Sequence, residues 1–283
     1  MPTPTEIPER TERLWISAPF GNYIQPDGAL ATLGTFTRRR RNGRLIRILK
    51  TVRYDPFSGA WVNKIGLRNP GIDWYVEKAK SGKLGAAKHL VSIHGFSDDE
   101  WYELLDLAAD AGPRGIELNL SCPNVGEVNW PSDLFPRAAA LGVPVVCKLP
   151  PVRFEGLFEA AFAAGLRTYH CCNTLPIPAG GMSGPPLKPV ALQCVQRLHE
   201  LAGAEADSLR LVGGGGIRKP ADVDDYAAAG VVAVAVGTKV MSPRYLVDHG
   251  PVRVLSARAE ERLGERPDPL VGSVLPAQAA TAD

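Results

Sequence analysis

Short apolar runs, many of them β-branched, recur along the chain and alternate with amphipathic segments. Several runs are almost continuously hydrophobic, which is typical of parallel strands that are covered by helices on the outside. We therefore predict strands at Leu14–Phe20, Leu45–Arg53, His89–Phe96, Gly115–Cys122, Pro144–Pro150, Thr168–Thr174, Arg210–Ile217 and Val232–Lys239.

The segments between these runs place apolar residues at helical spacing. In Asp98–Ala111, for example, Trp101, Leu104, Leu105 and Ala108 fall on one stripe of a helix. Comparable patterns predict helices at Pro131–Leu141, Phe154–Ala164, Lys188–Ala202, Pro220–Ala229 and Pro243–Ala257, the last interrupted at Gly250-Pro251.

Strand–helix alternation of this length indicates an α/β protein whose parallel strands close into a TIM (β/α)8 barrel. An open, doubly wound sheet is the alternative fold. We expect residues 1–263 to form a single barrel domain. Residues 264–283 are rich in Pro and Ala without a convincing pattern, and we expect them to form a flexible C-terminal tail.

Composition and charge exclude several classes of protein. The net charge of +2 gives no reason to expect a nucleic acid or a membrane as partner. The basic run Arg38–Arg41 precedes Asn42-Gly43 and is typical of a helix end followed by a turn, with a docking role as the alternative. Five cysteines without a Cys-x-x-Cys spacing indicate neither disulfides nor a metal site, and they favour the cytoplasm.

In a TIM barrel the active site lies at the C-terminal ends of the strands. Two of the predicted strands end in glycine-rich turns, at Gly213–Gly216 and at Gly237-Thr238. Backbone N–H groups in such turns commonly bind phosphate, although the glycines would also serve a tight turn alone. A third glycine is missing where a Rossmann motif needs it, because Arg218 stands there.

Other polar residues stand at or near predicted strand ends. Lys50, followed by Thr51, and Lys148 would offset charge on a ring system lying across the barrel, although a lone lysine is usually a surface residue. Several asparagines supply amide donors and acceptors that suit a flat ligand with several carbonyl groups, although each alone would also serve to cap a turn. They are Asn63, Asn119, Asn124 and Asn173.

Cys122 lies between Ser121 and Pro123 at the end of a predicted strand, where the chain must turn and expose the thiol. A thiol serves as a base near neutral pH when its surroundings help. An inert, packed thiol is the alternative. The other cysteines lack such placement, and we expect them in the core; they are Cys147, Cys171, Cys172 and Cys194.

Taken together these residues resemble a known family. Gly115–Val125 (GIELNLSCPNV) is similar to the catalytic signature of class 1 dihydroorotate dehydrogenases, in which a cysteine is the base. The resemblance runs in the family's order from about Lys50 to Lys239. It extends through Asn63–Gly71, Val146–Pro151, Asn173-Thr174, Gly180–Leu192, Gly213–Ile217 and Gly237-Thr238.

The resemblance implies oxidation of dihydroorotate to orotate in pyrimidine biosynthesis, with FMN as cofactor. Cys122 would remove a proton from C5 while hydride passes from C6 to flavin N5. Lys50 and Lys148 would lie beside the flavin ring. The implied substrate-binding set is Asn63, Asn119, Asn124, Asn173 and Thr174. The implied cofactor-binding set is Lys50, Thr51, Asn119, Lys148 and Gly184, with Gly214, Gly215, Gly237 and Thr238 around the phosphate.

The chain departs from the family at three places. Ser17–Asn22 replaces an early Ala-Ser-Gly flavin contact. His94 stands at a strand end where the family has a small residue; it is either structural or within reach of the ligands. The loops after Asn124 and Thr174 are short, and in the family these loops help to cover the substrate.

Alternatives therefore stay open at this point. One is a related dihydropyrimidine or specialised-metabolism reaction on the same flavin scaffold, and another is a flavin-binding barrel without dihydroorotate turnover. The electron acceptor is not visible in the sequence. Fumarate would suit a homodimer, whereas NAD would require an iron–sulfur flavoprotein subunit.

Overall fold

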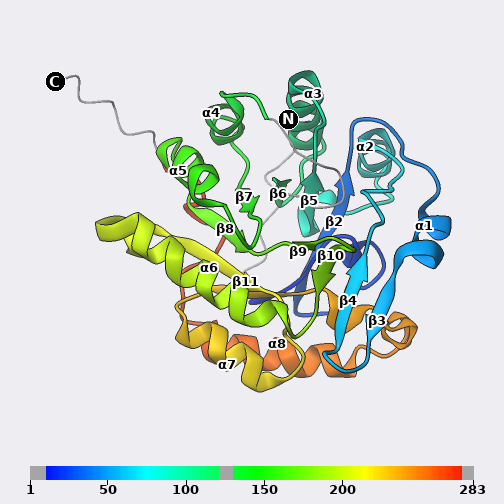
Figure 1. Cartoon of the computed structure of the whole chain (residues 1–283). Helices are drawn as coiled ribbons and strands as arrows, with labels where there is room; N and C mark the ends of the chain where they lie inside the picture. Colours follow the sequence, from blue (N-terminus) through cyan, green and yellow to red (C-terminus); the bar gives the residue numbers. More distant parts are fainter. Residues whose placement is uncertain (1–10, 121–129, 276–283) are drawn as a thin grey trace.

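The computed structural model describes residues 11–120 and 130–275, and in this part of the chain eight parallel strands close into a barrel (Figure 1). The first strand pairs with both the second and the last, at Leu14↔Ala29 and Leu14↔Val234, which closes the cylinder. The TIM-barrel prediction is confirmed. The barrel strands are β1 (Leu14–Ile16), β2 (Ala29–Phe36), β5 (Leu90–Ile93), β6 (Gly115–Asn119), β7 (Val145–Lys148), β8 (Thr168–Cys171), β11 (Arg210–Gly214) and β12 (Ala233–Val236).

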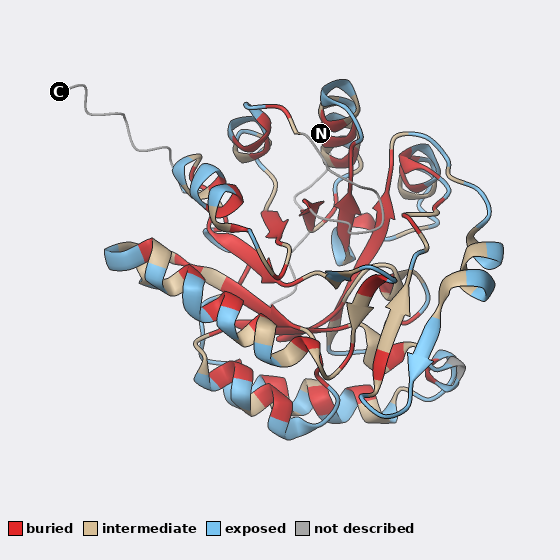
Figure 2. Cartoon of the chain, viewed as in Figure 1, coloured by how far each residue is buried: buried red, intermediate tan, exposed pale blue. Residues whose placement is uncertain are grey.

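Helices surround the barrel and turn their buried faces toward it (Figures 1 and 2). Within the described ranges, no helix combines the length and apolar character that a membrane crossing requires. The α-helices around the barrel are α2 (Ile72–Lys80), α3 (Asp98–Asp110), α4 (Leu134–Ala139), α5 (Glu155–Ala163), α6 (Leu187–Ala202), α7 (Pro220–Ala228) and α8 (Gly250–Leu263). Short 3-10 helices occur at η1 (Phe20–Asn22), η2 (Ala86–Lys88), η3 (Gly203–Ser208), η4 (Thr238–Val240) and η5 (Pro243–Leu246).

The helix α3 shows how the hydrophobic pattern produces this packing. Ser97 caps its first turn by accepting a hydrogen bond from the backbone N–H of Glu100, at 3.3 Å. The predicted apolar stripe is buried against the barrel, whereas the opposite face carries acidic residues. The buried stripe consists of Trp101, Leu104, Leu105 and Ala108.

The predicted second strand was wrong. Ala29–Phe36 forms β2, and the segment predicted as strand Leu45–Arg53 instead contains the helix α1 (Arg44–Thr51). The basic run Arg38–Arg41 therefore follows a strand, not a helix. The physical reason is that the apolar residues of α1 occur in pairs four positions apart, a spacing that suits a helix as well as a short buried strand.

A second, antiparallel sheet lies at one end of the barrel (Figure 1). One hairpin follows α1 and the other follows β8, and they join through the register Gly181↔Asn63. The short segment after Thr174 is thus part of this sheet. The strand order is β3 (Arg53–Asp55), β4 (Ala60–Asn63), β10 (Gly180–Ser183) and β9 (Leu175–Ile177).

The opposite end of the barrel is closed by the segment after α8. The side chain of Arg13 donates hydrogen bonds to the carbonyl groups of Pro267 (2.8 Å) and Gly264 (3.0 Å). The side chain of Leu270 is buried in the barrel interior. Residues 264–275 are therefore packed in place, which corrects the prediction of a flexible tail for this stretch. The interior cluster comprises Trp15, Leu30, Leu90, Val146, Val212, Ala233, Ala235 and Leu270.

Candidate functional site

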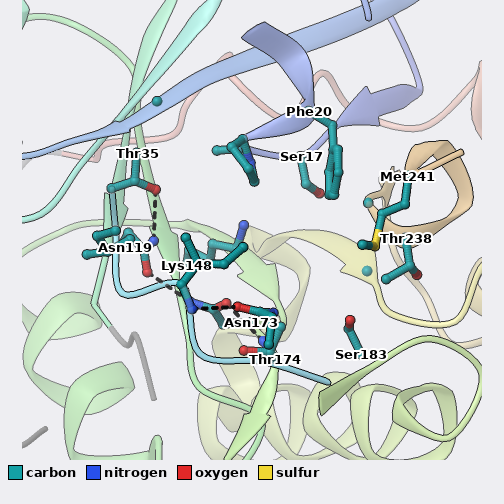
Figure 3. A pocket seen from close by; sticks show the side chains of 18 of the residues that line it. Ser17, Phe20, Thr35, Asn119, Lys148, Asn173, Thr174, Ser183, Thr238 and Met241 are labelled. Carbon is teal, nitrogen blue, oxygen red and sulfur yellow. Dashed lines mark hydrogen bonds between the residues drawn. The ribbon is translucent and has the colours of Figure 1, made fainter. Parts of the chain in front are cut away.

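A pocket of about 460 Å³ lies at the C-terminal ends of the barrel strands, beside the antiparallel sheet. This volume is in the range of small-molecule and cofactor sites. In Figure 3, Thr35 and Asn119 lie on one side of it, and Phe20, Thr238 and Met241 on the other. Ten residues that the sequence singled out line it: Asn63, Asn119, Lys148, Asn173, Thr174, Gly184, Gly214, Gly215, Gly237 and Thr238.

Two asparagines from different strand ends are joined in the pocket wall. The Nδ2 of Asn173 donates a hydrogen bond to the Oδ1 of Asn119 at 2.8 Å. The Nδ2 of Asn119 in turn donates to the hydroxyl of Thr35 at 2.9 Å, and that hydroxyl shares a hydrogen bond with Ser92 at 3.0 Å. These bonds fix which amide atoms face the pocket, so the pair is preorganised as a polar recognition surface (Figure 3).

Lys148 projects from the end of β7 into the pocket and is buried. Its Nζ lies 3.6 Å from the Oε1 of Glu117, and the Oε2 of Glu117 accepts a hydrogen bond from the Nδ1 of His170 at 2.8 Å. The three side chains come from the neighbouring strands β6, β7 and β8, and all of them point into the barrel. The register of these strands pairs Glu117 with Val146, and Lys148 with His170. Lys148 was predicted from the sequence, whereas Glu117 and His170 were not.

The charges of this buried group depend on one another. Burial by itself would raise the pKa of the Glu117 carboxyl, but the charge of Lys148 and the hydrogen bond from His170 together lower that pKa to about 2. Burial and the nearby charge of Lys148 lower the pKa of His170. At neutral pH Glu117 is therefore a carboxylate, and His170 is a neutral imidazole whose proton is on Nδ1.

At the end of β11, glycines are required because side chains would not fit or the backbone conformation excludes them. A Cβ on Gly214 would come within 2.8 Å of the Nε2 of His170. Gly215 and Gly216 have φ angles of +122° and +72°, which L side chains rarely adopt. Backbone groups thus approach the pocket directly at these turns and at Gly237, as an anion site requires.

The structure does not bring Lys50 and Thr51 to the described lining of the pocket. Lys50 is exposed on α1, because the segment predicted as the second strand is a helix outside the barrel. The hydroxyl of Thr51 donates to the carbonyl of Arg47 at 2.8 Å and accepts from the N–H of Lys64 at 3.2 Å, which secures the end of α1. Among the described lining residues, Lys148 is the one lysine.

The segment Ser17–Asn22 does reach the pocket, through Ser17, Phe20 and Asn22. The side chain of Asn22 accepts a hydrogen bond from the N–H of Gly34 at 3.1 Å and donates one to its carbonyl at 2.8 Å. Asn22 thereby fixes the backbone of β2 where that strand borders the site. The resemblance pointed to this segment as standing where the family has a flavin contact, but no sequence signal singled out Asn22 or Phe20 within it.

His94 is fully buried and lies outside the described lining of the pocket. Its Nδ1 donates a 2.7 Å hydrogen bond to the backbone carbonyl of Asn119, and burial lowers the pKa of the imidazole. The structural interpretation is thus the correct one of the two, because His94 supports Asn119 from behind.

Cys122 and Asn124 lie outside the residues that the structure describes. The other cysteines are buried and free, which confirms the prediction that they belong to the core; they are Cys147, Cys171, Cys172 and Cys194.

The fold and the pocket define a TIM-barrel protein with a ligand site in the usual place for that fold. A family profile described as dihydroorotate dehydrogenase matches residues 162–249. A solved structure of the enzyme DHODH from Eimeria tenella, in complex with ferulenol, superimposes with a TM-score of 0.68 at 16% identity, covering 89% of this chain and 80% of that one.

Sequence relatives are more informative. The dihydroorotate dehydrogenase B (NAD(+)) catalytic subunits of Lachnoclostridium phytofermentans and Alkaliphilus metalliredigens are each 31% identical. The matches cover 75% and 81% of this chain, and 75% and 82% of those proteins. Dihydroorotate dehydrogenase A (fumarate) of Limosilactobacillus reuteri is 30% identical over 74% of each chain. The chain belongs to the class 1 dihydroorotate dehydrogenase family, which confirms the resemblance found in the sequence.

Proposed function

We propose that this chain oxidises (S)-dihydroorotate to orotate with bound FMN, in the pocket at the C-terminal ends of the barrel strands. The observation that carries the proposal is the convergence of the Asn119–Asn173 pair and Lys148 on one pocket. Amide groups of both polarities match the alternating carbonyl and N–H groups of a pyrimidine ring. Family membership makes this substrate the first to test.

The residues present fit FMN. At Gly214 and Gly215 an added Cβ would come within 2.8 and 3.0 Å of neighbouring side chains, so bare backbone faces the pocket where a phosphate would be held. We assign Gly214, Gly215, Gly237 and Thr238 to the phosphate, and Lys148 and Gly184 to the ring system. The bound flavin supplies the hydride acceptor.

The protein's own groups orient the substrate and move the proton. We assign Asn63, Asn119, Asn173 and Thr174, together with Asn124, to the carbonyl and N–H groups of the pyrimidine. Cys122 takes the proton from C5 as the C5–C6 double bond forms, and the hydride leaves from C6. Lys148 lines the pocket and would lie beside the ring system of the flavin, where its positive side chain would favour negative charge on that ring.

The relatives are named for two different electron acceptors. The B-type relatives are catalytic subunits of an NAD(+) enzyme, whereas the A-type relative uses fumarate. We propose a cytoplasmic homodimer, with an iron–sulfur flavoprotein subunit added if NAD is the acceptor. Turnover of the purified chain alone with fumarate, but not with NAD, would assign it to the self-sufficient type.

An absorbance spectrum of the purified protein tests the proposal. We expect a flavin spectrum that bleaches on anaerobic addition of dihydroorotate and does not bleach with dihydrouracil, which lacks the carboxylate. Bleaching by dihydrouracil alone would move the function to a dihydropyrimidine reaction. Absence of flavin after incubation with FMN would contradict the proposal and leave a barrel without this redox activity.

A further inference from the structure

Helix α1 exposes its apolar side chains, whereas an amphipathic helix usually buries them against the protein. Its apolar side chains Leu45, Ile46 and Leu49 are 76%, 60% and 80% exposed. Of its basic side chains, Arg44 turns back toward the protein, where its guanidinium lies over the ring of Tyr23, 5.1 Å from the centroid, whereas Lys50 is exposed. None of the residues of α1 is buried, so core packing does not explain its apolar face.

The neighbouring hairpin extends this apolar surface. Strand β3 follows α1 directly and is exposed along its whole length, and both lie on the same outer edge of the molecule (Figures 1 and 2). Tyr54 on β3 is 49% exposed, and Phe57 in the turn that follows is 99% exposed. We call this surface the α1–β3 face: Leu45, Ile46, Leu49, Tyr54 and Phe57.

The α1–β3 face lies within the most basic stretch of the chain. Residues 38–68 contain ten Arg or Lys side chains and a single acidic one, Asp55. Because the whole protein has a net charge of only +2, the rest of the chain is net acidic. Arg38 is paired with Asp73 and Glu103, so the start of this basic stretch belongs to another surface. Lys50 and Arg53 are exposed beside the apolar residues of α1 and β3 and bring positive charge to the α1–β3 face.

We propose that the α1–β3 face docks on an anionic lipid bilayer. Exposed Leu, Ile, Tyr and Phe surrounded by Arg and Lys is the chemistry of a helix that lies in the interface of a negatively charged membrane. A second copy of the chain fits less well, because a two-fold contact through this face would place two strongly basic surfaces against each other.

Docking in this way would bring the candidate site close to the membrane. Arg44 of α1, Tyr23 and Val52 also line the pocket. The same short stretch of chain thus borders both the α1–β3 face and the pocket, so a bound bilayer would lie beside the entrance through which ligands pass.

Co-sedimentation of the full chain with vesicles tests the proposal. We expect binding to vesicles of phosphatidylcholine mixed with phosphatidylglycerol, weaker binding at high salt, and little binding to phosphatidylcholine alone. The double variants Leu45→Ser with Leu49→Ser, and Lys50→Glu with Arg53→Glu, should each weaken binding roughly tenfold or more. The matched control, Leu246→Ser with Val247→Ser, changes exposed apolar residues outside this face and should bind as the unmodified chain does.

Unfolding curves and light scattering, measured on the same proteins, complete the test. We expect unchanged unfolding curves, because the substituted side chains are exposed. Failure of the unmodified chain to bind anionic vesicles would overturn the proposal, as would equal binding by all variants. Conversion of a dimer to a monomer by the leucine variant, without vesicle binding by any protein, would overturn it in favour of self-association.

Discussion

Glu117 and Lys148 form a buried ion pair directly beneath the candidate site, with 3.6 Å between Oε1 and Nζ. Neither side chain exceeds 6% exposure, so water does little to stabilise either charge. Each charge therefore depends on the other, and the hydrogen bond from His170 holds the carboxylate in place. The position and charge of Lys148 are properties of this pair and not of the lysine alone.

Replacement of Glu117 by Gln should destabilise the protein by about 3 kcal/mol at pH 7, because it leaves the ammonium group of Lys148 buried without its counter-charge. Urea unfolding followed by circular dichroism measures this change. Glu103→Gln is a matched control, since Glu103 is a half-exposed surface partner of Arg38. An equal, small effect of both substitutions would contradict the importance of the buried pair.

The same pair predicts how stability depends on pH. The pKa of Glu117 is about 2 in the folded protein, below its ordinary value, so its contribution is complete above the ordinary pKa and is lost as pH falls toward 2. The free energy of unfolding should thus fall between about pH 5 and pH 2, and less steeply in Glu117→Gln. Parallel slopes for the two proteins would show that Glu117 is not responsible.

Lys148→Ala should weaken flavin retention or slow flavin reduction, whereas Lys50→Ala should alter neither. Both lysines were predicted from the sequence to lie beside the flavin, but Lys50 is exposed on α1 and only Lys148 projects into the pocket. Flavin content and anaerobic reduction rate, measured for both variants, decide between the two placements. A fully loaded, fully active Lys148→Ala protein would count against its assignment.

Cys122→Ser should retain flavin but reduce it roughly 10²- to 10⁴-fold more slowly at neutral pH, because a serine hydroxyl is a far weaker base than a thiol. Single-turnover reduction by dihydroorotate is the appropriate measurement. Cys194→Ser serves as a control, since that thiol lies on the buried face of α6. An undiminished rate in Cys122→Ser would remove the residue from the mechanism.

Asn173→Ala should raise KM for dihydroorotate about tenfold, because it removes an assigned substrate contact and the hydrogen bond that orients Asn119. The loss of one such bond corresponds to about 1–1.5 kcal/mol. Asn42→Ala, at an exposed position, should leave KM unchanged. Steady-state kinetics give both values, and a normal KM in Asn173→Ala would exclude a role in substrate binding.

Leu270→Ala should lower stability by about 2–4 kcal/mol, because it opens a cavity at the closed end of the barrel. Val271→Ala is the control, since Val271 is 68% exposed and its loss should be nearly neutral. Thermal unfolding distinguishes the two. A negligible effect at both positions would mean that residues 264–275 act as the loose tail expected from the sequence.

Much of the framework was predictable from the sequence. The last six barrel strands alternate with helices whose apolar stripes are regular, so periodicity locates them within a few residues. The glycine turns after β11 and β12 were found because their position after an apolar run is informative, and after β11 the backbone conformation also demands glycine.

The second strand was missed because its sequence, Ala29–Phe36, is rich in small residues and includes Gly34. Its burial comes from neighbouring strands, which the local sequence does not encode. Leu45–Arg53 was predicted as the second strand instead, because its run of apolar residues is typical of a buried strand. In the structure these residues are exposed on α1. The misplacement of Lys50 and Thr51 follows directly from that error.

The partners of the site residues could not be predicted either. Glu117 meets Lys148 and His170, and Thr35 meets Asn119, only between strands that are far apart in sequence. Each of these residues is polar, and the local sequence pattern of its strand therefore predicts an exposed side chain. Closure of the barrel determines that they face inward and meet.

The contacts of Arg13 also constrain the order in which the chain can assemble on a ribosome. Its side chain binds the carbonyl of Pro267, which is 254 positions later in the sequence, and β1 pairs with β12. The first strand therefore leaves the ribosome long before its second neighbour or its closing segment exists. During that interval one edge of β1 remains open to wrong pairing, so the nascent chain should depend on chaperones until the closing segment has emerged.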